Sequence, residues 1–175
     1  MSVKVTVPSP VVSTGIRRPS NAERTAGRAR ENASVEIELV PEFGARLPSG
    51  ALLFGTTEAE ARHLLEWFGQ PQKSFVCGTA WSWRVRIADR WVQAGAGGDG
   101  LLGEIRVMRT IEYAEGEPAG IPVTYRGVDV FERSVAEIEF LLGAARRPEL
   151  RLTGANGYAQ SATLTDLTRP ATPRR

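Results

Sequence analysis

Apolar and polar side chains alternate with the period of a β-strand over several short segments of the chain. The alternation is clearest in residues 35–39, 81–87 and 101–108, and residues 91–94, 122–125 and 158–167 also look extended. A tight turn at Asp89-Arg90 and a glycine-rich loop at 95–100 separate three of these segments. Residues 81–108 are therefore predicted to form an antiparallel meander with one apolar face and one polar face.

A helix is predicted to begin after Thr57. Thr57 and Glu60 have the spacing of a capping box, in which each side chain accepts a hydrogen bond from a backbone N–H at the helix start. The apolar residues that follow recur on one helical face, and they are Ala61, Leu64, Leu65 and Phe68. Gly69 favours the end of the helix there, and Pro71 prevents its continuation.

The same helix pattern recurs 77 residues later without gaps. The capping box returns as Ser134 and Glu137, and the terminating proline returns as Pro148. The apolar stripe returns at Ile138, Leu141 and Leu142, and Tyr158 takes the place of Trp81. We interpret the shared offset as a tandem duplication; the alternative is a chance coincidence of two ordinary capped helices.

These elements predict an α+β fold built from two copies of a helix plus antiparallel strands, at about 50–110 and 127–168. The second copy is short of strands, so it must borrow them, and residues 35–39 and 121–125 are the candidates. The simplest arrangement is one continuous antiparallel sheet with both helices packed on one face. This single domain, residues 35–168, is expected between a flexible basic segment at 1–34 and a disordered basic tail at 169–175, because both ends lack large apolar side chains.

Composition sets few further limits. Of the 175 residues, 42% are hydrophobic and 24% are charged, as in ordinary globular proteins. No apolar run reaches the roughly 18 residues of a membrane-spanning helix, and no secretory leader is recognisable, so membrane insertion is not expected. Cys77 is a single cysteine that cannot form an internal disulfide, which favours a cytoplasmic location.

The net charge of +2 hides an uneven distribution. Residues 1–33 carry six basic and two acidic side chains, and residues 169–175 add three arginines. The remaining residues therefore have a net charge of −5, and this body would repel a polyanion. Nucleic acid is expected at most as a weak ligand of the basic tails, which could also tether the body to an anionic membrane.

No catalytic residue, metal site or cofactor site is predicted. The segment Gly95–Gly100 matches G-x-G-x-x-G, but a strand pattern follows it, which favours a glycine-rich hairpin over a dinucleotide-binding loop. His63 is the only histidine, and Cys77 is expected to be a small core residue, so neither suggests a metal site or a catalytic triad. Glu-x-Glu pairs at 36/38, 58/60, 115/117 and 137/139 are explained by solvation and by helix dipoles.

The meander contains the most informative side chains. Trp81 and Trp83 share the parity of the apolar positions 85 and 87, so both are expected to lie in the core. The opposite face carries the candidate partner-binding residues Arg84, Arg86, Trp91 and Arg106. Arginine and tryptophan are enriched at binding hot spots. The alternative interpretation is a solvated sheet face with cross-strand ion pairs.

The segment Phe54-Gly-Thr-Thr-Glu-Ala-Glu-Ala61, continued by Leu65, Gly69 and Pro71, resembles the helix motif of the β-lactamase-inhibitor-protein-like superfamily. The resemblance implies helices on one face of an antiparallel sheet, and a sheet face that grips another protein. Residues 125–131 also resemble a segment of uncharacterised actinobacterial proteins and, more faintly, of the phagosome assembly factor family. The chain lacks the export signal, lipidation cysteine and disulfide pair of superfamily members, so neither β-lactamase inhibition nor an outer-membrane role is carried over.

The resemblance and the polar face together suggest a cytoplasmic bacterial protein–protein interaction module without enzymatic activity or cofactor, such as an immunity or inhibitor protein. Its partner would be another protein bound on the exposed sheet face. The alternative is an enzyme or small-ligand binder with a pocket between the two repeats. These two hypotheses differ in the site they require, a sheet face or a deep cleft.

Overall fold

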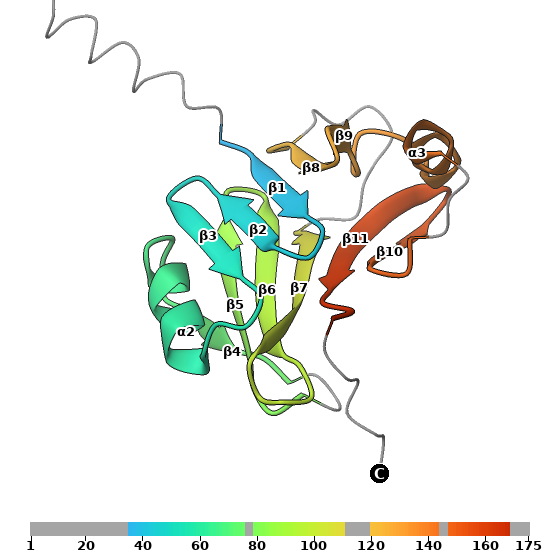
Figure 1. The fold of residues 1–175 in the computed structure, drawn as a ribbon. Coiled ribbons are helices and arrows are strands. Elements are labelled where there is room, and N and C mark those ends of the chain that lie inside the picture. Colours follow the sequence, from blue (N-terminus) through green and yellow to red (C-terminus); the bar gives the residue numbers. More distant parts are fainter. Residues whose placement is uncertain (1–34, 76–78, 111–119, 144–146, 169–175) are drawn as a thin grey trace, which may run out of the picture. The chain divides into compact units, whose positions relative to one another are not determined.

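A computed structural model describes residues 35–75, 79–110, 120–143 and 147–168. The chain divides into two units, Met1–Ala33 and Ser34–Arg175, and every described residue belongs to the second. The described strands form one five-stranded and one six-stranded sheet, accompanied by two helices (Figure 1). The prediction of an α+β fold with two helices and mostly antiparallel strands is therefore confirmed.

The five-stranded sheet, sheet A, has the order β3-β2-β1-β8-β9. Its strands are β1 (Ile37–Val40), β2 (Gly44–Leu47), β3 (Gly50–Leu53), β8 (Val123–Tyr125) and β9 (Val128–Asp129). The central strand β1 is antiparallel to β2 and parallel to β8. It therefore joins segments of the chain that are far apart in sequence.

The six-stranded sheet, sheet B, has the order β10-β11-β7-β6-β5-β4 and is antiparallel throughout. Its strands are β4 (Gln72–Lys73), β5 (Ser82–Ile87), β6 (Arg90–Ala96), β7 (Leu102–Arg109), β10 (Leu150–Ala155) and β11 (Tyr158–Thr165). The predicted meander is present as β5, β6 and β7.

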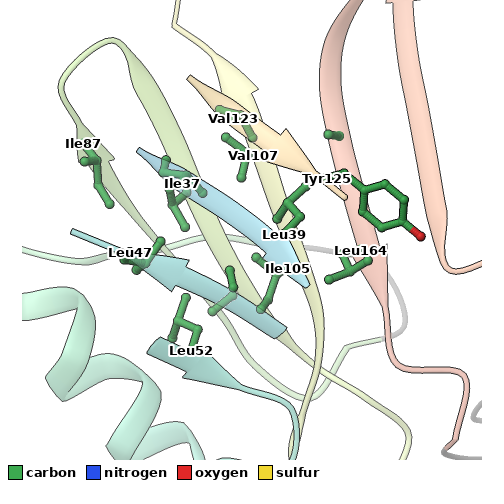
Figure 2. Close-up of a cluster of buried hydrophobic side chains, with 14 of the residues drawn as sticks. Ile37, Leu39, Leu47, Leu52, Ile87, Ile105, Val107, Val123, Tyr125 and Leu164 are labelled. Carbon is green, nitrogen blue, oxygen red and sulfur yellow. The ribbon is translucent and has the colours of Figure 1, made fainter. Parts of the chain in front are cut away.

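Side chains of both sheets meet in one hydrophobic core. Figure 2 shows Ile37 and Leu39 of β1 in the same cluster as Ile105 and Val107 of β7. All four side chains are fully buried. In Figure 1, strands β1–β3 cross in front of β5–β7, which is the arrangement that lets the apolar faces of the two sheets cover each other.

The strands thus do not form the single continuous antiparallel sheet that we predicted, because they are divided between two sheets and one pair is parallel. The helices are too short to cover a sheet of this size. Helix α2 (Glu58–Glu66) buries only Ala61 and Leu65, and helix α3 (Val135–Leu142) buries only Ile138. A second sheet supplies the apolar surface that two short helices cannot supply.

Both helices begin at the predicted capping boxes. The backbone N–H of Thr57 donates to Glu60 Oε2 at 2.9 Å, and the backbone N–H of Glu60 donates to Thr57 Oγ1 at 3.4 Å. The corresponding distances for Ser134 and Glu137 are 3.0 and 3.3 Å. These hydrogen bonds satisfy backbone donors that the first helical turn leaves without partners.

The two tryptophans expected in the core differ from each other. Trp81 is 5% exposed, and its indole N–H donates to the carbonyl oxygen of Gly100 at 2.7 Å. Trp83 is only half-buried, and its indole N–H donates to Glu58 Oε1 at 2.8 Å, at the start of α2. Trp83 therefore lies at the border of the core, where it is hydrogen-bonded to the first turn of α2.

Candidate functional site

Sheet B has one face in the core and a second face turned away from it. Along β5, Val85 and Ile87 point to the core, so Arg84 and Arg86 point to the other side. The strand register extends this second face across the neighbouring strands. We call it the outer face of sheet B; its residues are Gln72, Ser82, Arg84, Arg86, Trp91, Gln93, Gly95, Glu104, Arg106, Met108, Arg151, Thr153, Ser161, Thr163 and Thr165.

The structure brings the four predicted partner-binding residues onto this one face. Arg84 and Arg106 lie in one row across the sheet, because both pair with Gln93 between them. Arg86 and Trp91 are direct partners in the adjacent row. Arg86 is exposed, whereas the other three are half-buried.

The guanidinium group of Arg84 lies over an aromatic ring. Its guanidinium carbon lies 4.8 Å from the centroid of the Trp91 ring, within the range of a cation–π interaction. One terminal nitrogen donates to Gln72 Oε1 at 3.4 Å, a long hydrogen bond to a neutral acceptor. The Nε atom of Arg84 is buried without a hydrogen-bond partner in the described structure. Its charged group is thus fixed in position but poorly satisfied.

Arg106 is held on two sides. Its Nε donates to Thr163 Oγ1 at 3.2 Å, and Nη2 forms an ion pair with Glu104 Oε1 at 3.2 Å. Thr163 is only 2% exposed, so this anchor is rigid. Arg106 therefore presents its guanidinium in one defined orientation.

A buried polar network lies between these two arginines. The amide nitrogen of Gln93 donates to Ser74 Oγ at 3.0 Å and to Ser82 Oγ at 2.8 Å. The two serine hydroxyl groups are 2.8 Å apart. Because Gln93 is 6% and Ser82 is 1% exposed, the network makes the centre of the outer face stiff.

Sequence reasoning missed Gln93 and Thr163. Both have the parity of the polar face, and this alternation is the signal that could have identified Gln93, which is two residues from Trp91. Thr163 could not be linked to Arg106 from the sequence, because the pairing of β11 with β7 joins distant segments.

The other residues with candidate chemistry lie elsewhere. His63 on α2 has a side chain that is 77% exposed and contacts Glu66 at 3.5 Å. The glycine-rich segment forms the β6–β7 hairpin and leads into a strand, as predicted. Cys77 and the pair at 115/117 lie outside the described residues. Within the described ranges, no three His, Cys, Asp or Glu side chains gather as metal ligands.

Two further polar groups are buried elsewhere in the fold. Arg90, on the core side of β6 and 3% exposed, forms an ion pair with Asp89 and lies 5.1 Å from the Phe131 ring centroid. Burial lowers the pKa of Arg90. The Tyr125 hydroxyl donates to Glu149 Oε1 at 2.6 Å, and burial, with this bond and the nearby charge, raises the pKa of Tyr125 to about 12.

Comparisons of the chain with protein-family models, with curated proteins and with solved structures gave no match. In the part of the chain that the structure describes, neither helix has the length and apolar character needed to span a bilayer.

Proposed function

We propose that the protein is a non-enzymatic binding module that holds another protein on the outer face of sheet B. One observation carries this proposal: Arg84 and Arg106 are fixed on either side of the buried Gln93, with Trp91 beside them. Arginine and tryptophan dominate the energetics of many protein interfaces. Side chains that are already ordered lose less conformational entropy when a partner binds. An immunity or inhibitor protein of the cytoplasm would work in this way.

We also infer that this module arose by tandem duplication. The capping boxes at Thr57 and Ser134 are 77 residues apart, and each helix follows a hairpin and precedes a strand pair. Counted inward from one edge of sheet B, the strands are β4, β5 and β6, and counted inward from the other edge they are β10, β11 and β7. This order supports two equivalent halves, in which β4 and β5 correspond to β10 and β11. Strand β1 has no counterpart in this scheme.

The test of the binding face removes its two central side chains. The double variant Arg84→Ala/Trp91→Ala is compared with the unchanged protein in affinity capture from a native lysate. The matched control is Arg46→Ala/Trp67→Ala, which removes the same residue types from exposed positions on β2 and at the end of α2. Circular dichroism confirms that all three proteins are folded.

We expect the unchanged protein and the control to capture the same proteins, and the face variant to lose them. Loss of an interface hot spot typically costs 2 kcal/mol or more, which corresponds to roughly a thirtyfold weaker affinity. Equal capture by the face variant and the control would show that the outer face of sheet B is not the binding surface.

A further inference from the structure

We infer that the partner presents an acidic protein surface, whose carboxylates pair with Arg84 and Arg86 on the outer face of sheet B. This inference rests on the proposed function, and it specifies the chemistry of the partner. Three features of the chain support it, namely the distribution of charge, the unpaired guanidinium groups and the position of Arg84 beside Trp91.

The outer face has the opposite charge to the rest of the body. Residues 34–168 contain 13 basic and 18 acidic side chains. The described outer face carries the four arginines Arg84, Arg86, Arg106 and Arg151 against a single acidic residue, Glu104. An acidic partner is therefore attracted to this face and repelled by the remainder of the body, which orients the encounter.

Three of these arginines, Arg84, Arg86 and Arg151, have no carboxylate partner in the described structure. Arg106 is paired with Glu104. Arg84 has only a long hydrogen bond to the neutral Gln72, and Arg86 donates through Nε to the backbone oxygen of Ala88 at 2.9 Å. A guanidinium has five N–H donors in a planar fork that matches a carboxylate. Arg84 and Arg86 can therefore each still bind a carboxylate of a partner.

The position of Arg84 makes it suited to bidentate pairing. Its guanidinium carbon lies 4.8 Å from the centroid of the Trp91 ring, and this contact restricts the movement of the group. A carboxylate that approaches its terminal nitrogens forms charge-assisted hydrogen bonds with a side chain that is already restricted. Arg86 is exposed on the same strand, two residues away, and can pair with a second carboxylate of the partner.

A nucleic acid fits this face less well. A duplex has one phosphate charge per about 1.7 Å of axis, and tight binding needs several phosphate contacts. The described face offers three arginines without a carboxylate partner and places Glu104 in the same surface, where it would repel a phosphate chain. The excess of acidic residues elsewhere in the body adds to that repulsion.

The test uses a fluorescent peptide of alternating glutamate and serine, about 12 residues long, in an anisotropy titration at an ionic strength of about 0.15 M. The same peptide with lysine in place of glutamate and a single-stranded oligothymidine are measured in parallel. Of the three ligands, we expect that only the glutamate peptide binds. The double variant Arg84→Glu/Arg86→Glu should weaken its affinity about tenfold or more, which is the effect of about one lost charge pair.

Two controls make the result specific. The double variant Arg46→Glu/Arg62→Glu introduces the same charge change at exposed positions outside the face and should alter the affinity less than about threefold. Glu104→Gln removes the acidic residue of the face while keeping an acceptor for Arg106, and it should strengthen binding. This gain cannot result from misfolding.

The inference is overturned if the glutamate peptide does not bind, if oligothymidine binds with the same sensitivity to the variants, or if Glu104→Gln weakens the peptide complex. The lysate capture experiment distinguishes a failure of this inference from a failure of the proposed function. If proteins captured from lysate are lost by Arg84→Ala/Trp91→Ala but retained by Arg86→Glu, the binding face stands and the acidic partner is wrong. If the face variant retains them, the binding face itself is wrong.

Discussion

At the scale of single residues, the tight hairpins of this fold place backbone strain at specific positions. The β10–β11 turn uses Asn156 and Gly157 with φ of 57° and 80°, which is the residue pair preferred for two consecutive positive φ values. The β5–β6 turn instead places Ala88 at φ 50°. An alanine side chain clashes with the backbone in this region, so Ala88 is strained where Gly157 is not.

Exchanging alanine and glycine at these two turns should have opposite effects. Ala88→Gly is expected to raise the free energy of unfolding by up to about 1 kcal/mol, because relief of the strain outweighs the added freedom of the unfolded chain. Gly157→Ala should lower it by about 1 kcal/mol, since no atom lies within 4 Å of the added methyl group and only backbone strain changes. Urea denaturation measures both; a loss of stability in Ala88→Gly would contradict the assignment of strain.

At the scale of elements, each of the two helices combines a capping box with a small packed surface. Each buries at most two side chains fully, and the N-terminal hydrogen bonds add to the stability that this packing supplies. Hydrogen bonds from the backbone and side chain of Thr57 hold the pKa of Glu60 below its usual value. Hydrogen bonds from the side chain and backbone of Ser134 lower the pKa of Glu137 in the same way.

Removal of either cap should lower the free energy of unfolding at neutral pH. It should also make that free energy less dependent on pH in the acidic range. Thr57→Ala and Ser134→Ala should each cost about 1 kcal/mol at pH 7. Because the folded pKa of each glutamate is below 4.5, the ionised glutamate of each box stabilises the fold above that pH, and this contribution is lost as the pH falls through the folded pKa.

Urea denaturation between about pH 3 and pH 7 measures this change, since that range spans the ordinary carboxylate pKa values. Thr57→Ser keeps the hydroxyl group and serves as the matched control, with stability close to that of the unchanged chain. An unaltered acid profile in both alanine variants would contradict the role of the boxes.

Elements with local signals were predictable, and elements defined by their partners were not. The cap at Thr57, the stripe at Leu65 and the meander at 82–109 each depend on residues close together in sequence, and all are present. Residues 44–47 were not among the predicted strands, yet they form β2 by pairing with β1 and β3. The shared outer face followed from parity, but its buried anchors Gln93 and Thr163 required the register.

At the scale of the whole molecule, stability depends on the contact between two sheets that share one core. Leu39 is fully buried on β1, opposite Ala45 of β2 and Tyr125 of β8. Its side chain belongs to the core that sheet B also lines, so it links three strands of sheet A to the other layer. A cavity at this position weakens both sheets together.

Leu39→Ala should therefore lower the free energy of unfolding by about 2–5 kcal/mol, in a single cooperative transition. The control is Leu53→Ala on β3, which removes the same atoms from a side chain that is 40% exposed and should cost less than half as much. Equal losses for the two variants in urea denaturation would show that the contact between the sheets is not the main source of stability.

The parallel pairing of β1 with β8 also determines the order in which the protein can fold during synthesis. Ile37 pairs with Val123, so one edge of β1 has no partner until the second half of the chain has been made. At about 5–20 residues per second, the ribosome takes roughly 4 to 17 seconds to add the intervening residues. During that interval the nascent chain exposes an open strand edge, a feature that promotes aggregation and that chaperones protect.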